Sequence, residues 1–245
     1  MIPYLRGGIV DDRSLYQAIL GLSKPWFVKG VELRLGEGEV RVAVEVDAEV
    51  ALQCPDCQRT APRYDQSEER RWRHLDTCQY RTIVTGRVPR VRCGEHGVKQ
   101  ITVNWAEDRS RFTALFEAFA IRVLQECSLS AAAELLAVTW EEIAGIQRRA
   151  VARGLARRVD EPVRVIGVDE TSFQKRHEYI TAVIDLERDR VLWVGDQRRE
   201  ATLQAYWDSR KPEELAALEA VVMDMWDPYI AATRKGVPDG LNKLV

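Results

Sequence analysis

Residues 54–57 read Cys-Pro-Asp-Cys and residues 93–96 read Cys-Gly-Glu-His, and these two short stretches organise the N-terminal part of the chain. In each stretch two residues separate the outer side chains, which is the spacing of a knuckle that presents two ligands to one tetrahedral metal ion. The 35 residues between the stretches are enough for a strand to run out and fold back. The pattern predicts a structural zinc site formed by Cys54, Cys57, Cys93 and His96.

Two other interpretations of this segment stay open. A single Cys-x-x-Cys pair can be a redox motif, although no βαβ pattern surrounds this one. His74 and Cys78 lie between the two stretches and could replace one of the four ligands. The fifth cysteine, Cys127, is expected to fill core space at the end of a helix. An odd number of cysteines with no secretion signal argues against a disulfide framework.

Strand patterns surround the two knuckles. Residues 31–35 and 40–50 alternate apolar and polar side chains around a Gly-Glu-Gly-Glu turn, which predicts an antiparallel hairpin. Residues 69–92 are expected to continue as short strands. We therefore expect a β-rich zinc-binding domain over residues 1–105 of an α+β multidomain chain. The buried face of its hairpin would carry four valines, Val40, Val42, Val44 and Val46.

From Arg111 the hydrophobic period becomes helical, which predicts a helix-turn-helix domain over residues 106–160. A short second helix is expected near residues 130–137. Thr139 and Glu142 then form the Thr-x-x-Glu pattern of a capping box, so a third helix begins there and runs toward Arg158. Three helices with a tight middle connection are typical of a helix-turn-helix. The first helix would bury one face, made of Phe112, Leu115, Phe116, Phe119, Val123 and Leu124.

The third of these helices carries a row of arginines at every fourth position, beside its apolar face. Such a helix can lie against DNA phosphates while its first turns enter a groove. The alternative is a solvated helix face with no partner. The basic segment upstream favours DNA, and the expected DNA-binding residues are Gln147, Arg148, Arg149, Arg153 and Arg157.

After Pro162 the pattern predicts a third domain, the N-terminal part of an α/β domain over residues 161–245. Asp169 and Glu170 follow its first strand, and Asp224 follows a later one. The expected elements, in order, are strands at 163–168, 177–186 and 191–194, two helices, a strand at 221–223, a helix that Asp227 caps with Pro228 in its first position, and the start of a strand at 241–245.

Asp169 and Asp224 are candidate metal ligands. Two neighbouring strands that end in aspartate can hold Mg²⁺ or Mn²⁺ ions for in-line phosphoryl transfer. Strand-end aspartates are also common as turn or cap residues, so the pattern alone leaves both interpretations open. Glu170 should point to the opposite face of the strand from Asp169. His177 is expected to be an ordinary strand residue rather than a base.

Charge is distributed unevenly along the chain. The formal net charge is −2, but residues 59–99 carry +5 and residues 166–230 carry −6. This layout suits a chain that binds a polyanion with one module and divalent cations with another. No apolar run approaches the roughly 18 residues that a membrane helix needs, so we expect no membrane partner and a cytoplasmic protein.

Five motifs follow one another along nearly the whole chain. They are Cys54-Pro-Asp-Cys57, Arg73-His-Leu-Asp76, Val88-Pro-Arg-Val-Arg-Cys93 with Glu95-His-Gly-Val98, Gly167-Val-Asp-Glu170, and Met223-Asp-Met-Trp-Asp-Pro-Tyr229. Together, and in this order, they resemble the ISL3 family of bacterial insertion-sequence transposases. The last of the five is the most specific.

The resemblance implies an N-terminal zinc-binding region, a helix-turn-helix, and a catalytic domain of the RNase H-like, DDE type. It implies that Asp169 and Asp224 are the first two catalytic carboxylates and hold magnesium or manganese. The implied partner is double-stranded DNA of the terminal inverted repeats, bound by a homo-oligomer. A DDE domain also needs a third acid, a glutamate that family members carry further along, so we expect this chain to stop short of it.

Two functions of different classes follow. The first is a transposase that binds transposon-end DNA and cuts and joins strands by metal-dependent phosphoryl transfer. The alternative is a catalytically inactive DNA-binding remnant or regulator of transposition, in which residues 40–158 recognise the element ends.

Overall fold

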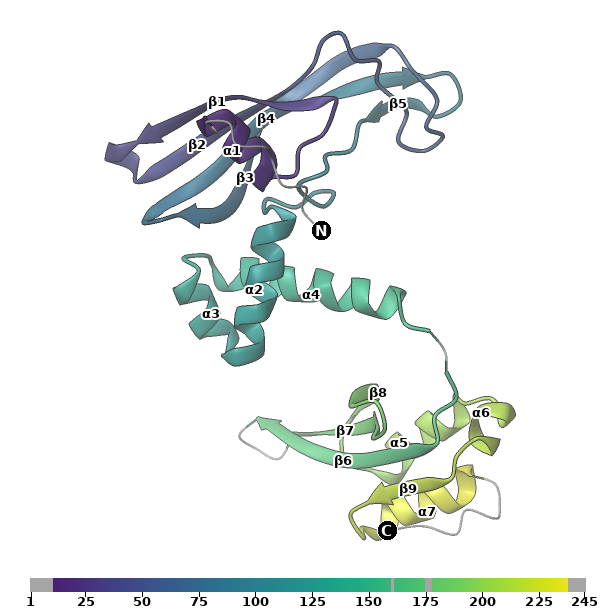
Figure 1. Ribbon diagram of the computed structural model, residues 1–245. Helices are drawn as coiled ribbons and strands as arrows, with labels where there is room; N and C mark the ends of the chain where they lie inside the picture. Colours follow the sequence, from purple (N-terminus) through teal and green to yellow (C-terminus); the bar gives the residue numbers. More distant parts are fainter. Residues whose placement is uncertain (1–10, 160, 175–177, 238–245) are drawn as a thin grey trace. The chain divides into compact units, whose positions relative to one another are not determined.

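The computed structural model describes residues 11–159, 161–174 and 178–237 of the chain. Two compact units divide it, an N-terminal unit, Met1–Arg157, and a C-terminal unit, Arg158–Val245 (Figure 1). The N-terminal unit contains α1 (Asp12–Ile19), β1 (Trp26–Arg34), the 3-10 helix η1 (Leu35–Glu37), β2 (Glu39–Val46), β3 (Arg63–Thr77), β4 (Tyr80–Cys93), β5 (Gly97–Gln100), α2 (Ala114–Glu126), α3 (Leu129–Leu135) and α4 (Trp140–Ala156). The C-terminal unit contains β6 (Val165–Gln174), β7 (Glu178–Asp185), β8 (Arg190–Asp196), α5 (Glu200–Asp208), α6 (Pro212–Ala216), β9 (Ala220–Met223) and α7 (Asp227–Gly236).

A five-stranded mixed sheet forms the base of the N-terminal unit, with the order β1-β2-β4-β3 and β5 paired to β4. β1 and β2 make the antiparallel hairpin that the alternating valines predict. Val40, Val42 and Val44 are buried, and Val46 packs half-buried against the same core. Residues 63–93 form one long hairpin of β3 and β4, where several short strands were expected.

Three tryptophans occupy the centre of the N-terminal core. The ring of Trp105 meets Trp26 and Trp72 edge-to-face, with ring centroids 4.7 and 5.3 Å apart. All three rings are buried, and Tyr16 of α1 and Leu20, the residue after α1, join the same cluster. Aromatic rings bury large apolar areas and prefer this edge-to-face geometry, so they hold the loop before α2 against the sheet.

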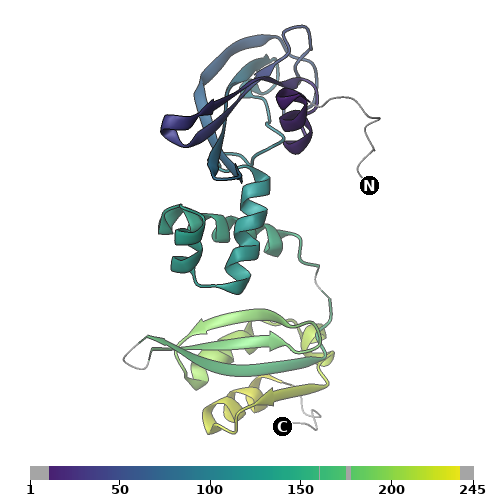
Figure 2. The same ribbon diagram turned by 60° about the vertical axis from the view of Figure 1, so that its left-hand side comes forward.

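The helices α2, α3 and α4 pack around a second core (Figure 2). Their N-caps are Thr113, Ser128 and Thr139, and the capping box between Thr139 and Glu142 forms as predicted. The predicted face of α2 is only partly correct, because Leu115 and Phe119 are 45% exposed. The buried side chains are those of residues 112, 116 and 120. Leu115 and Phe119 each directly precede one of these buried residues, and neighbouring positions on a helix point about 100° apart.

The C-terminal unit contains a four-stranded sheet of order β8-β7-β6-β9. β6, β7 and β8 are antiparallel neighbours, and β9 runs parallel to β6. The helices α5 and α7 pack against each other and contribute to one core. Its deeply buried side chains include Ile166, Val183, Leu203, Trp207, Val221 and Tyr229.

Two boundaries of the C-terminal unit differ from the expectation. β6 continues beyond residue 168 to Gln174, because it keeps pairing with β7 after its ladder with β9 has ended. The N-cap of α7 is Trp226, and Asp227 is the first residue of the helix instead of its cap. His177 and residues 241–245 lie outside the described residues. In the described part of the chain, no helix is long and apolar enough to span a membrane.

Candidate functional site

The two knuckles bring Cys54, Cys57, Cys93 and His96 together. One ligand atom from each of the four side chains lies within 4.8 Å of the other three. The Cys57 and Cys93 sulfurs are 3.7 Å apart, and Nδ1 of His96 lies 3.6 Å from Cys93 Sγ and 3.9 Å from Cys54 Sγ. Two sulfurs bound to one tetrahedral zinc at ordinary Zn–S distances would be about 3.8 Å apart. The donor set and its spacing therefore fit zinc.

The backbone around each knuckle explains why the ligands converge. In the first knuckle the Gln58 N–H donates to the Cys54 carbonyl, and Gln58 takes a positive φ of 58° to close the turn. In the second, Cys93 pairs with Gly97 across the β4–β5 turn, where Gly97 has a φ of 70°. Ion pairs join the two knuckles, from Asp56 to Lys99 and from Arg59 to Glu95.

Hydrogen bonds favour the thiolate at two of the three cysteines. The backbone N–H and ring of His96 lower the pKa of Cys93 to about 7. The backbone N–H of Arg59 lowers the pKa of Cys57, whereas burial raises the pKa of Cys54. Thiolates are the form that binds metal, so the knuckle backbone prepares this cluster for a cation.

The other cysteines and His74 lie away from this cluster. The His74 ring is buried on β3 and shares a 2.8 Å hydrogen bond with Thr113 Oγ1. Burial lowers the pKa of His74 to about 4, so the ring is neutral at pH 7. Cys78 is exposed in the β3–β4 turn, and Cys127 packs at the end of α2 as expected. Neither His74 nor Cys78 belongs to the four-residue group.

The arginines of α4 divide into two sets. Arg149 Nη2 lies 2.6 Å from Oε1 of Glu117, and Arg153 Nη1 lies 3.4 Å from its Oε2. Glu117 is on α2, its side chain is 3% exposed, and Ser110 Oγ donates to it over 2.7 Å. Arg153 Nη1 is closer to Glu107, at 2.6 Å, in the segment before α2. Arg149 and Arg153 are therefore partly buried, and their ion pairs link α4 to α2 and to the segment that precedes it.

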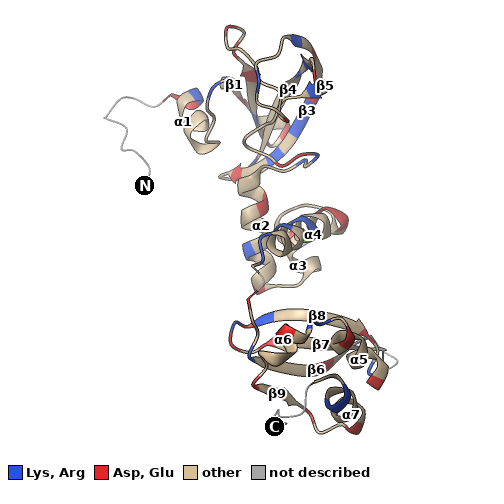
Figure 3. Cartoon of the chain, turned by 90° about the vertical axis from the view of Figure 1, so that its right-hand side faces the viewer, with Lys and Arg blue, Asp and Glu red and all other residues tan. Residues whose placement is uncertain are grey.

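Gln147, Arg148 and Arg157 are the exposed members of the predicted DNA-binding set. Lys and Arg residues, blue in Figure 3, also lie along β3 and α4. Sequence reasoning missed Glu117. The signal that could have identified it is a glutamate directly beside the buried Phe116, one turn after the cap Thr113, on a helix facing several arginines.

Asp169 and Asp224 lie at the end of the β6–β9 ladder. Its last residue pair is Val168 with Met223, so Asp169 is the next residue along β6 and Asp224 is the residue directly after β9. Both are exposed, whereas Val168 and Met223 are buried in the core. Alternation along a strand therefore puts both carboxylates on the face away from the core. Glu170 is half-buried on the opposite face, as predicted.

Glu170 has a partner that sequence reasoning also missed. Arg198 Nη2, from the turn between β8 and α5, lies 2.9 Å from Glu170 Oε1. The same guanidinium is 4.3 Å from the centroid of Trp226. No local pattern links these residues, because 28 positions separate each of the two partners from Arg198.

Three family models match consecutive parts of the chain. Residues 51–96 match the zinc-finger of transposase IS204/IS1001/IS1096/IS1165. Residues 101–151 match the helix-turn-helix domain of transposase family ISL3, and residues 166–240 match the transposase domain of the DDE type in that family. The matches have the same order as the motifs, and each covers one of the sites described above.

Two curated relatives are similar to the chain over most of its length. The transposase for insertion sequence element IS1557 of Mycobacterium tuberculosis is 29% identical over 235 residues, which are 93% of this chain and 53% of the relative. The transposase for insertion sequence element IS1001 of Bordetella parapertussis is 26% identical over 225 residues, 89% of this chain and 54% of the relative. The chain thus spans about half the length of the relatives it matches. Its three domain matches and these relatives together show that the chain belongs to the ISL3 family of insertion-sequence transposases.

Proposed function

We propose that the chain binds the DNA at the ends of an insertion sequence and supplies two carboxylates, Asp169 and Asp224, of a metal-dependent strand-transfer site. The observation that carries the proposal is the register of β6 and β9, which brings two exposed aspartates to the end of one parallel ladder. The match of this segment to a DDE transposase domain supports the same role.

The arrangement of the C-terminal sheet agrees with an RNase H-like domain. Three consecutive antiparallel strands are followed, after a helical crossover, by a fourth strand that runs parallel to the first and lies beside it. This is the arrangement expected for that fold. In a sheet of this kind the ends of the first and fourth strands meet at one edge, which is where Asp169 and Asp224 lie.

The part that these residues play in the chemistry follows from their charge and exposure. Divalent ions bound by such carboxylates activate water and neutralise charge on the phosphoryl group during in-line displacement. Asp169 and Asp224 would bind the ions and keep them at the open face, where a phosphodiester can reach them. The Asp169 Oδ1 atom already accepts the Glu170 N–H over 2.8 Å, which restrains its rotation.

The zinc cluster would have a structural role. Four ligands of one tetrahedral ion leave no open position for a substrate. Bound zinc would close the first knuckle onto the β4–β5 turn and fix that end of the long hairpin. The exposed β3 and β4 arginines next to it would then present a stable basic surface to DNA phosphates.

For the helix-turn-helix we propose that Gln147, Arg148 and Arg157 contact DNA, with Arg149 and Arg153 holding α4 in place. An exposed glutamine on a recognition helix can bind adenine through two hydrogen bonds, and arginine can bind guanine or phosphate. The double-stranded end of the element would be the partner, and two copies of the chain on two ends would form the complex.

DNA binding can be tested by gel retardation with DNA that carries the element end, at several salt concentrations. We expect retardation that weakens steeply with salt, because phosphate contacts release counterions. Arg148→Ala should lower the affinity and reduce the salt slope by about 1. Failure to retard DNA even at low salt would contradict the proposal.

The metal site can be tested in the same protein with Mn²⁺ and electron paramagnetic resonance, which reports the free ion. We expect Mn²⁺ binding that Asp169→Asn and Asp224→Asn each abolish, whereas Asp227→Asn leaves it unchanged. Strand nicking of the labelled DNA with Mg²⁺ would then show activity in this chain. Binding of Mn²⁺ that survives both Asp169→Asn and Asp224→Asn would contradict the assignment.

A further inference from the structure

The two motifs that carry the aspartates also contain residues that no metal role explains. They are Glu170 in the first motif and Trp226 and Tyr229 in the second. All three are linked, directly or through one neighbour, to the turn that holds Arg198. We propose that Arg198 is a positioning residue that sets the separation between Asp169 and Asp224. This inference rests on the proposed function.

Arg198 contacts the chain next to both aspartates. Its Nη2 atom lies 2.9 Å from Oε1 of Glu170, the residue directly after Asp169. Its guanidinium lies 4.3 Å from the ring centroid of Trp226, two residues after Asp224. One side chain therefore links the continuation of β6 to the continuation of β9.

The Arg198 side chain makes this link just beyond the point where backbone pairing between β6 and β9 ends. The β6–β9 ladder ends at Val168 and Met223, so no ladder pairing joins Asp169 to Asp224. After Asp224 the chain turns sharply, with the Trp226 N–H donating to the Asp224 carbonyl over 2.7 Å. Without a side-chain link, the Asp224 turn could move relative to β6.

The position of Arg198 is itself fixed by the second motif. The Tyr229 hydroxyl is 2.7 Å from Thr181 Oγ1, which donates to the carbonyl of Gln197 over 2.8 Å. Because the threonine proton is used on Gln197, Tyr229 is the donor to Thr181. Gln197 has a φ of 71°, and its N–H donates to the Tyr179 carbonyl. These bonds hold the residue before Arg198 and thereby aim its side chain at Glu170 and Trp226.

The geometry favours positioning over direct contact with substrate. Glu170 continues the core-facing row of Ile166 and Val168, whereas Asp169 lies on the open face. The Glu170 side chain is 14% exposed and its oxygen holds Arg198 on the core side of the sheet. Arg198 therefore acts on the carboxylates through Glu170 and Trp226.

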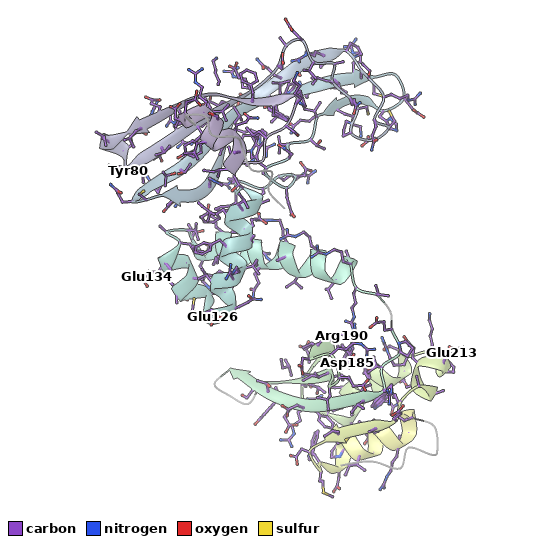
Figure 4. All side chains as sticks on the ribbon, in the orientation of Figure 1. Tyr80, Glu126, Glu134, Asp185, Arg190 and Glu213 are labelled. Carbon is purple, nitrogen blue, oxygen red and sulfur yellow. The ribbon has the colours of Figure 1, made fainter. Side chains whose placement is uncertain are left out.

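A matched control exists in the same sheet. Asp185 is fully buried and pairs with Arg188 and Arg190, over 3.2 and 3.0 Å, at the opposite end of β7 (Figure 4). Arg190 resembles Arg198 in being a partly exposed arginine on a buried carboxylate, with side-chain exposures of 25% and 30%. Within the part of the chain that the structure describes, Arg190 forms no hydrogen bond or ion pair with residues 169–170 or 224–226. Its loss should therefore weaken the fold without changing the separation of the two aspartates.

The test is Mn²⁺ affinity of the whole chain, measured by titration with electron paramagnetic resonance, together with thermal melting. Manganese prefers oxygen ligands and will not compete for the sulfur cluster. We expect Arg198→Gln to weaken Mn²⁺ binding by about 10-fold, as loss of a residue that orients metal ligands usually does. Arg198→Lys keeps the charge opposite Glu170 and should restore part of the affinity. Arg190→Gln should lower the melting temperature and leave the Mn²⁺ affinity unchanged.

The outcomes separate the inference from the proposed function. Wild-type Mn²⁺ affinity in Arg198→Gln, with or without a lower melting temperature, would overturn the positioning role and leave the metal site intact. Equal loss of affinity in Arg198→Gln and Arg190→Gln would also overturn it, because the effect would then be one of general stability. If the unmodified chain shows no Mn²⁺ binding that depends on Asp169, the proposed function itself fails. If Arg198→Gln does not fold, Arg198→Lys decides, because it keeps a charge opposite Glu170 but lacks the guanidinium over Trp226. Unchanged Mn²⁺ affinity in Arg198→Lys would overturn the positioning role, and a partial loss would support it.

Discussion

Replacing Arg149 with methionine removes the nearest cation from a buried carboxylate. Arg149 donates from Nε and Nη2 to the same oxygen of Glu117, over 3.2 and 2.6 Å. After the substitution Glu117 keeps the Ser110 hydroxyl at 2.7 Å and Arg153 at 3.4 Å. In the unmodified chain the Glu117 side chain is 3% exposed and the Arg149 side chain 34% exposed, so the substitution takes a cation away from a buried carboxylate.

The expected loss of stability follows from these partners. Removing one partner of a fully buried ion pair costs about 3–5 kcal/mol, because an uncompensated charge is left inside the protein. Here Arg149 is 34% exposed and two partners remain, so we expect about 2–3 kcal/mol, below or at the bottom of that range. For a folded unit of this size the melting temperature should fall by about 5–10 °C.

The assay is thermal melting followed by circular dichroism, with DNA retardation on the same samples. Arg148→Met is the matched control, because it removes an exposed arginine from the adjacent position. It should change stability by less than about 0.5 kcal/mol while weakening DNA binding. The double variant Glu117→Met/Arg149→Met should recover part of the lost stability, since no charge is then stranded. An Arg149→Met protein that melts like the wild type but binds DNA poorly would refute the reasoning and return Arg149 to the DNA-contacting set.

Three further predictions concern other buried groups. Burial lowers the pKa of His74 to about 4, whereas a histidine in the unfolded chain has a pKa of about 6.5. As the pH falls, the unfolded state therefore gains a proton before the folded state does. Between pH 7.5 and 5 the free energy of unfolding should drop by about 2 kcal/mol. Urea unfolding at both pH values checks this, and His74→Gln should lose that part of the pH dependence; an identical dependence in both proteins would contradict it. Cys54→Ser should lose zinc in metal analysis and disorder the first knuckle, and a purified wild type without zinc would refute the ligand assignment. Asp185→Ala leaves Arg190 without its carboxylate and Arg188 with Glu161 alone, and should lower the stability of the C-terminal unit by about 3 kcal/mol in urea unfolding. An unchanged midpoint would show that these ion pairs add nothing.

Features set by neighbours in the sequence could be predicted. The knuckles depend on two-residue spacings, and the capping box on Thr139 and Glu142 three residues apart, so both are present in the structure. The buried face of the strand around Val42 was also predicted correctly, because the alternation of apolar and polar residues is a local property. Asp169 and Asp224 could be proposed because each follows a short apolar run.

Features that depend on residues far apart in the sequence could not be predicted from it. In the sequence, nothing distinguishes Arg149 and Arg153 from solvated arginines. Their ion pairs are with Glu117, which lies 32 and 36 residues earlier in the chain. Leu115 carries an apolar side chain but is exposed, because the rotation of α2 is fixed by what packs against Phe116 and not by α2 alone. The end of β6 depends on β7 as well, so the expected stop at residue 168 was wrong.

The Arg-His-Leu-Asp motif at residues 73–76 shows how tertiary contacts give meaning to a motif that has no chemistry of its own. The Arg73 N–H donates to the Arg111 carbonyl, and the Thr113 N–H donates to the Arg73 carbonyl, so β3 pairs with the segment that leads into α2. The Arg73 guanidinium also lies over the Phe116 ring, paired with Asp76.

The middle of the motif extends this junction into both cores. His74 meets the α2 cap residue Thr113, and Leu75 packs into the core of the three helices. The sheet that carries the zinc knuckles and the helices that carry Arg148 therefore share side chains within one compact unit. Two surfaces joined in this way lose little orientational freedom when both bind one DNA duplex, which lowers the entropic cost of binding. If the chain binds DNA as proposed, the motif contributes to that binding through the junction between β3 and α2, without a DNA contact of its own.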